Sequence, residues 1–155
     1  MLQDGDKAPD FELPTESGET LRLSRLKGRP VVLYFYPKDD TSGCTAEAKD
    51  FSRLATDFRK AGVEVVGVSP DSVESHRKFS RKHDLAVRLA ADADKSVATA
   101  YGVWVEKSMY GRKYMGVERS TFLIDKSGRI ARSWRKVKVP GHAAQVLTAA
   151  QTMKK

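Results

Sequence analysis

Cysteine is almost absent from this sequence, because Cys44 is the only one among its 155 residues. A chain with one cysteine has no internal disulfide, no CxxC redox pair and no zinc site built from several thiolates. Long apolar runs are missing too, since the longest, residues 31–36, is far shorter than the roughly 20 residues that cross a bilayer. Residues 1–10 carry three acids and lack the apolar region of a secretory signal. We therefore expect a cytoplasmic protein without a membrane span, in which one sulfur does any thiol chemistry.

Repeats, low-complexity tracts and Pro/Gly/Ser-rich linkers are also lacking, so we expect residues 1–155 to form a single domain. The net charge of +8 raises the possibility of nucleic-acid binding. Acidic residues nevertheless interleave with the basic ones, as in residues 53–60 and 77–84, and zinc-finger spacing is absent. We interpret the charge as a solvated surface and expect no specific nucleic-acid partner. A nucleic-acid binder would instead keep a salt-dependent affinity for DNA when Cys44 is changed to serine.

Short apolar runs, typical of buried strands, alternate along the chain with apolar residues at helical spacing. The expected elements are, in order, a β-hairpin formed by residues 10–13 and 20–23, a strand at 31–36, a helix through 48–58 that ends at Gly62, a strand at 63–69, a helix that starts at a capping box of Asp71 and Glu74 and ends near His83, an extended piece at 86–89, a short helix at 94–101, strands at 120–125 and 130–136 joined by a turn, and a final helix with the apolar stripe Ala143, Val146, Leu147 and Ala150.

The order of these elements predicts the fold class. Strands that alternate with helices pair in parallel through right-handed crossovers, while the turn at residues 126–129 adds an antiparallel pair. We expect an α/β fold with a mixed central sheet flanked by helices and an N-terminal β-hairpin. Open sheets of this kind bind ligands at the carboxyl ends of their strands, which directs attention to the segment after residue 36.

Cys44 lies in a polar segment between the first buried strand and the next helix. If the helix begins near Ser42 or Gly43, the sulfur lies in its first turn, where free backbone N–H groups and the helix dipole favour a thiolate. The alternative is a small apolar cysteine that fills the core, which is the usual state of a free thiol. A polar strand-to-helix loop favours the reactive cysteine, because a core residue would lie within an apolar stripe.

Two segments carry a resemblance to a known family. Pro37-x-x-x-Thr41-x-x-Cys44 matches the PxxxTxxC signature of peroxiredoxins, and residues 36–47 resemble the bacterioferritin-comigratory (BCP/PrxQ) group. Residues 109–125, which include Glu118-Arg119-Ser120-Thr121, are similar to the segment that carries the family's essential arginine. The resemblance extends over essentially the whole chain. It implies a thioredoxin-like fold and thiol-dependent reduction of hydrogen peroxide or organic hydroperoxides, without a metal or a bound cofactor.

The resemblance also implies roles for single residues. Cys44 is the expected peroxidatic nucleophile, Thr41 a hydroxyl ligand of peroxide, Pro37 a wall of the pocket and Arg119 the fixed cation. Glu47, one helical turn after Cys44, either pairs with Arg119 and orients it or simply complements the helix dipole. A more abundant thiolate is also less nucleophilic, so fast reaction depends mainly on stabilising the departing oxygen. The family further suggests a monomer with thioredoxin, or glutaredoxin and glutathione, as reductant.

This sequence departs from the family pattern at the resolving cysteine. Many members of the group place it five residues after the nucleophile, where this chain has Lys49, and others at a position that aligns with Ser80. Without either cysteine, the sulfenic acid of Cys44 cannot close an intramolecular disulfide. We therefore expect a one-cysteine cycle resolved by an external thiol. Ser80 is either the natural residue or a replacement of a resolving cysteine, and the sequence leaves both open.

Other features are weaker and stay as alternatives. A peroxide-sensing redox switch or a holdase would use the same sulfenic acid without turnover. His76, His83 and His142 lack tight metal-ligand spacing and are expected to face solvent. An aromatic-rich loop at residues 104–115 either covers the active site or packs on the sheet, and packing is the preferred interpretation. Phosphate-binding glycine patterns are missing, so we expect no nucleotide.

Overall fold

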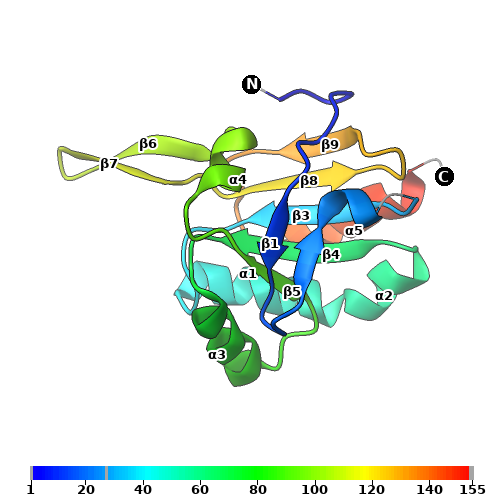
Figure 1. The fold of residues 1–155 in the computed structure, drawn as a ribbon, viewed down its shortest axis with the longest axis horizontal. Helices are drawn as coiled ribbons and strands as arrows, with labels where there is room; N and C mark the ends of the chain where they lie inside the picture. Colours follow the sequence, from blue (N-terminus) through cyan, green and yellow to red (C-terminus); the bar gives the residue numbers. More distant parts are fainter. Residues whose placement is uncertain (1, 27, 154–155) are drawn as a thin grey trace.

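The computed structural model describes residues 2–26 and 28–153, so the two ends of the expected 1–155 domain lie outside the described residues. Figure 1 shows a central five-stranded sheet with the strand order β5-β4-β3-β8-β9. Strands β3, β4 and β5 are parallel, β8 runs antiparallel to β3, and β9 runs antiparallel to β8. The predicted mixed sheet and the N-terminal hairpin of β1 and β2 are confirmed. The elements are, in chain order, β1 (Glu12–Pro14), β2 (Thr20–Arg22), the short 3-10 helix η1 (Leu23–Leu26), β3 (Val31–Phe35), α1 (Ser42–Arg53), α2 (Ala55–Lys60), β4 (Glu64–Ser69), α3 (Val73–His83), β5 (Arg88–Ala91), α4 (Ser96–Ala100), β6 (Trp104–Met109), β7 (Arg112–Val117), β8 (Ser120–Ile124), β9 (Ile130–Trp134) and α5 (His142–Thr152).

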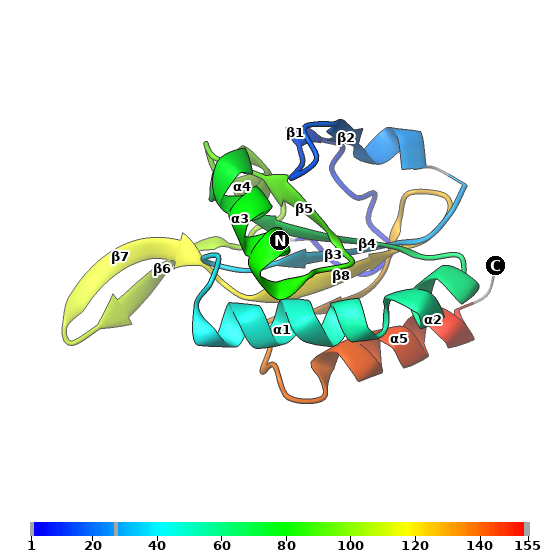
Figure 2. The ribbon, with the colours of Figure 1, turned by 90° about the horizontal axis from the view of Figure 1, so that it is seen from below.

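Strand β3 lies at the centre of the sheet and separates two apolar cores. Val31, Leu33 and Phe35 point into one core, and Val32 and Tyr34 point into the other, because side chains alternate along a strand. Figure 2 shows α1, α2 and α5 on one side of the sheet, with the β1–β2 hairpin and α4 on the opposite side. Burial on both faces explains why the strand reads as a continuous apolar run. Its carboxyl end leads directly into the loop before α1.

The helix expected through residues 48–58 is two helices. Leu54, with φ −95° and ψ 5°, separates α1 from α2. Phe51 of α1 and Phe58 of α2 nevertheless bury their side chains in the same core. The apolar spacing therefore continues across the break, and periodicity alone could not reveal it.

The predicted capping box of α3 is also wrong by one residue. Ser72 is the N-cap, and its hydroxyl accepts a hydrogen bond from the backbone N–H of Ser75 at 3.1 Å. Asp71 instead accepts hydrogen bonds from the Asp39 backbone N–H and from the Ser69 hydroxyl. Its carboxylate thus joins the loop before α1 to the start of α3.

The segment 104–115, expected to be a loop, is part of the β6–β7 hairpin, which projects from the body of the molecule (Figures 1 and 2). Tyr110 and Gly111 turn the chain with positive φ angles, as a two-residue hairpin requires. Trp104 packs against the core as predicted. The expectation that this segment packs on the sheet is wrong for three other residues, whose side chains are exposed: Tyr110, Tyr114 and Met115.

Candidate active site

Cys44 is the third residue of α1, in the helix turn that follows the carboxyl end of β3. The predicted first-turn position is confirmed. The residue is only 1% exposed and belongs to the core that contains Tyr34 and Phe51, so it also has the burial of a core cysteine. Its sulfur is distinguished by one contact, since the Arg119 Nη2 donates to Sγ at 3.2 Å. A buried thiol beside a guanidinium has the surroundings of a reactive cysteine.

Arg119 lies between β7 and β8 and reaches across to the start of α1. In its guanidinium group, Nη2 donates to Cys44 Sγ, and Nη1 donates to Glu47 Oε1 at 2.6 Å. A side chain at Gly43 would press on this group, because a Cβ there would lie 3.3 Å from Nη2. Burial disfavours the charge of Arg119, yet Glu47 and Cys44 outweigh that effect and raise the pKa of the guanidinium. The cation is therefore permanent and held by two partners.

Glu47 is 1% exposed and belongs to α1, one turn beyond Cys44. Its expected pairing with Arg119 is present in the structure. Burial raises the pKa of Glu47 to about 7, although the neighbouring Arg119 acts to lower it. The second oxygen, Oε2, is buried and has no hydrogen-bond partner among the described residues. This carboxyl is consequently a buried group whose charge depends on pH near neutrality.

Thr41 and Pro37 frame the loop that enters α1. Thr41 is the N-cap residue by backbone position, but its hydroxyl donates to the Lys38 carbonyl at 2.9 Å rather than capping the helix. Thr41 is exposed. Pro37 is half-buried at the start of the loop, directly after Tyr36. Both residues therefore lie in the segment that joins β3 to α1, three and seven positions before Cys44.

The two positions considered for a resolving cysteine differ in their surroundings. Lys49 is exposed on α1, and Ser80 is half-buried on α3. Cys44 is a free cysteine. A disulfide between α1 and α3 would need a second thiol that this chain does not contain.

Buried polar residues beside this loop were missed by the sequence analysis. Asp39 accepts hydrogen bonds from the Tyr36 hydroxyl at 2.6 Å and lies 2.7 Å from Nδ1 of His76. The prediction that the histidines face solvent is wrong for His76 and His142, which are 0% and 4% exposed. His76 precedes Phe79 by three residues and shares its buried helix face. That spacing was the available signal.

His142 is the first residue of α5. Its Nε2 is 2.8 Å from the Thr121 hydroxyl, and its ring packs edge-on against Phe51 and Trp134. Burial lowers the pKa of His142 to about 4, and the charge of Arg119 adds to the effect. His83, in contrast, is partly exposed and contacts the Asp40 carboxylate.

One group of possible metal ligands occurs among the described residues. Asp39, Asp71 and His76 each offer one ligand atom, and these atoms lie within 4.8 Å of one another. Their carboxylate and imidazole atoms already bond to protein donors and acceptors. The hydrogen bonds of the protein account for this group.

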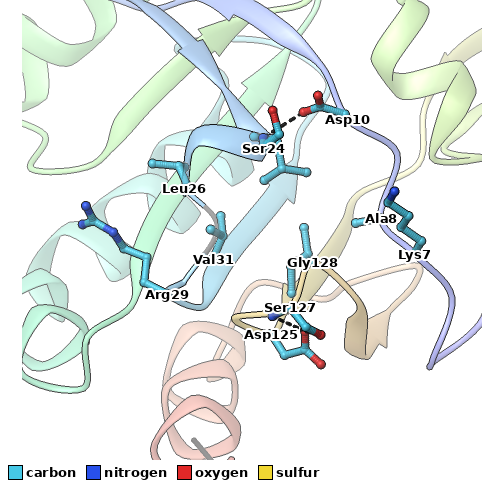
Figure 3. Close-up of a pocket in the computed structure, with 12 residues that line it drawn as sticks. Lys7, Ala8, Asp10, Ser24, Leu26, Arg29, Val31, Asp125, Ser127 and Gly128 are labelled. Atoms are coloured by element: carbon cyan, nitrogen blue, oxygen red, sulfur yellow. Dashed lines mark hydrogen bonds between the residues drawn. The ribbon is translucent and has the colours of Figure 1, made fainter.

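A cavity of about 140 Å³ lies elsewhere, at the opposite end of the sheet (Figure 3). Val31 and Ile124 line it, where β3 begins and β8 ends. The carboxylates on its wall are already used, since Asp10 accepts from the Ser24 backbone N–H and Asp125 from that of Ser127. Cys44 is not among the lining residues.

No helix of the described residues is both long and apolar enough to cross a membrane.

The comparison with protein families decides the classification. The model of the AhpC/TSA family matches residues 5–133. The chain belongs to the AhpC/TSA family. Within this family it is 52% identical over 146 residues to a putative peroxiredoxin bcp of Coxiella burnetii, covering 94% of this chain and 97% of the relative. It is 51% identical over 153 residues to peroxiredoxin Bcp of Bacillus subtilis, covering 99% and 96%.

Solved structures support the same placement among the AhpC/TSA proteins. The bacterioferritin comigratory protein of Xanthomonas campestris is 45% identical, with a TM-score of 0.88 over 91% of this chain and 90% of that one. The predicted thioredoxin-like peroxiredoxin fold and BCP/PrxQ group are confirmed, and so is the enzyme class, thiol-dependent peroxidase. Two further structures of the Xanthomonas protein each have a different cysteine replaced by serine, and these two positions have the same separation as Cys44 and Ser80.

Proposed function

We propose that this chain reduces hydrogen peroxide and organic hydroperoxides through Cys44, with Arg119 as the group that stabilises the departing oxygen. The supporting observation is the 3.2 Å contact between Arg119 Nη2 and the sulfur in the first turn of α1. Alkyl peroxide reduction is described for the Xanthomonas relative. The same chemistry fits a site in which a cation and helix amides face one sulfur.

The oxidation step follows from these groups. The Cys44 thiolate attacks one oxygen of the peroxide, the O–O bond breaks, and an S–O bond forms to give a sulfenic acid. The other oxygen leaves as hydroxide or alkoxide and takes up a proton to become water or an alcohol. Arg119 and the first-turn amides donate to the oxygen on which charge grows, and the Thr41 hydroxyl binds the peroxide. Pro37 forms a wall of the pocket, and Glu47 orients Arg119.

Reduction of the enzyme requires two external thiols, because the chain has a single cysteine. The first attacks the sulfenic sulfur, releases water and forms a mixed disulfide with Cys44. The second attacks that disulfide, so that Cys44 returns to the thiol and the donor leaves as a disulfide. Thioredoxin is the proposed donor, with glutaredoxin or glutathione as the alternative, and the proposed setting is a monomer in the cytoplasm.

Steady-state peroxide consumption tests this function. Wild type and Cys44→Ser are compared with dithiothreitol, thioredoxin and glutathione, each tried as the only reductant. We expect many turnovers by the wild type with at least one donor and none by the variant. Oxidation that stops after one equivalent with every donor would contradict turnover and favour the redox switch. A variant as active as the wild type would remove Cys44 from the mechanism.

A further inference from the structure

The loop between β3 and α1 is attached to helix α3 through one buried carboxylate. Asp39 accepts a hydrogen bond from the Ser75 hydroxyl at 2.8 Å, and its Oδ2 lies 2.7 Å from His76 Nδ1. Its backbone N–H donates to Asp71 at 2.8 Å, just before α3. The side chain of Asp39 is 4% exposed and that of His76 is 0% exposed. These contacts fix the loop to α3 at a position without water access.

The protons of this cluster can be counted from the partners. His76 Nε2 lies 3.0 Å from the Ala90 carbonyl, which only accepts, so this nitrogen carries a proton. Nδ1 faces the Asp39 carboxylate, which already accepts from the Tyr36 and Ser75 hydroxyls. A proton therefore lies between Nδ1 and Oδ2, because two bare acceptor atoms would repel each other at 2.7 Å. Removal of either side chain would leave its partner buried without this hydrogen bond.

The position of this pair links it to the sulfur. Only Asp40 separates Asp39 from Thr41, and α1 begins at Ser42, two residues before Cys44. A shift of the loop would move the Thr41 hydroxyl and the first-turn amides relative to Arg119. Misplacement of reacting groups by about 1 Å can lower a rate about 100-fold.

We propose that Asp39 and His76 are positioning residues of the peroxide site, holding Thr41 and the first turn of α1 in register with Arg119. This inference rests on the proposed peroxidase function of Cys44. Neither residue touches the reacting atoms. Both act through the loop, which the buried pair clamps to α3.

The neighbouring Asp40 provides a matched control. Its carboxylate contacts Lys82 and His83 of the same helix, but its side chain is 45% exposed. Hydrogen bonds from His83 and Lys82 lower the pKa of Asp40. Exposed ion pairs of this kind contribute little to the free energy of folding. Asp40→Asn therefore removes a link between loop and helix without leaving a buried charge.

Two rate constants test the proposal in Asp39→Asn, His76→Gln and Asp40→Asn. The first is oxidation of the reduced protein by hydrogen peroxide in a single turnover. The second is alkylation of Cys44 by iodoacetamide, which needs a reactive thiol but no peroxide ligands. We expect peroxide oxidation to fall about 100-fold in the first two variants. Alkylation in these variants, and both rates in Asp40→Asn, should stay within about twofold of wild type.

Non-additivity supplies a further readout. The double variant Asp39→Asn/His76→Gln should be no slower than either single variant, because the pair acts as a unit. Should the first two variants fail to fold, Tyr36→Phe removes one donor to Asp39 without exposing a charge, and an about tenfold slower peroxide oxidation is expected.

Several results would overturn the positioning role. A parallel fall of both rate constants would indicate general loosening of the site, and unchanged peroxide rates in folded variants would show that the loop needs no clamp. If the wild type itself fails to react with peroxide, the proposed function fails instead. The two failures are thereby distinguishable.

Discussion

Arg119 differs from the other arginines that form ion pairs, because its charge is enclosed. The side chain of Arg119 is 16% exposed and that of its partner Glu47 is 1% exposed. In the pair that Arg53 forms with Asp50 on α1, the exposed fractions are 66% and 32%. Exposed pairs contribute about 0–1 kcal/mol to stability. A preorganised donor aimed at developing charge contributes about 3–4 kcal/mol to a transition state. The burial of Arg119 therefore matches a role in catalysis better than a role in surface stability.

Replacement of Arg119 by lysine tests the need for a guanidinium fork. Lysine keeps the positive charge but cannot donate in parallel to Glu47 and to the reacting oxygen. We expect Arg119→Lys to reduce the rate of peroxide oxidation about 100-fold or more, measured by stopped-flow mixing of reduced protein with peroxide. Arg53→Lys is the control and should retain the wild-type rate. A lysine variant of near-normal rate would contradict the role of Arg119.

The charge of Glu47 gives the site a dependence on pH. Its pKa is raised to about 7, so the carboxyl loses its charge, and with it its attraction for Arg119, as the pH falls through that value. Glu47→Gln is neutral at every pH. We therefore expect the wild type to outpace Glu47→Gln above about pH 7 and the ratio of their peroxide rates to approach one below it. A ratio that stays constant with pH would argue against this orienting role.

Local sequence predicted Cys44 and its surroundings far better than the buried histidines. Pro37, Thr41 and Cys44 lie within one short segment, so its resemblance to the peroxiredoxin signature can be read without knowledge of distant contacts. The partner of His76 is Asp39, which precedes it by 37 positions, and no local pattern joins the two. The polarity of histidine therefore suggested solvent exposure for a residue that the folded chain buries against a carboxyl group.

Helices and strands were predictable where burial is uniform along the element. They were harder to predict where tertiary contacts decide the conformation of the chain. Strand β3 is buried along its whole length and reads directly from its apolar run. The β6–β7 hairpin has mostly exposed strands, so it lacks the alternation that identifies a half-buried strand. The break at Leu54 also left no signal, because α1 and α2 pack on the same core.

The start of α5 should make folding stability depend on pH. The pKa of His142 is about 4 in the folded chain, compared with an ordinary value of 6.5. Between these two pH values the unfolded chain binds a proton at this residue and the folded chain does not. Stability from this group is complete above pH 6.5 and is lost as the pH falls to 4, by about 3 kcal/mol. Urea unfolding of wild type and His142→Gln measures this loss. An equal loss in both proteins would exclude His142 as its source.

At the scale of the whole molecule, the single cysteine defines the catalytic cycle. Ser80 lies on α3, the helix to which the active-site loop is attached, and a cysteine there would supply the missing second thiol. We expect Ser80→Cys to form an intramolecular disulfide with Cys44 after one equivalent of peroxide. Mass spectrometry of the unreduced chain would show the loss of both free thiols. Persistence of a free thiol and a sulfenic acid in this variant would show that the two positions cannot meet.

The site and the cavity lie at opposite ends of β3, with Cys44 in the helix that follows its carboxyl end and the cavity beside Val31 at its start. A sulfenic acid trapping experiment tests the central claim most directly. Reduced protein is mixed with one equivalent of hydrogen peroxide in the presence of dimedone, and the modified peptide is identified. The account predicts one dimedone adduct per chain, on Cys44, formed rapidly in the wild type and slowly in Arg119→Lys. Equal rates of adduct formation in the two proteins, or no adduct on Cys44, would contradict it.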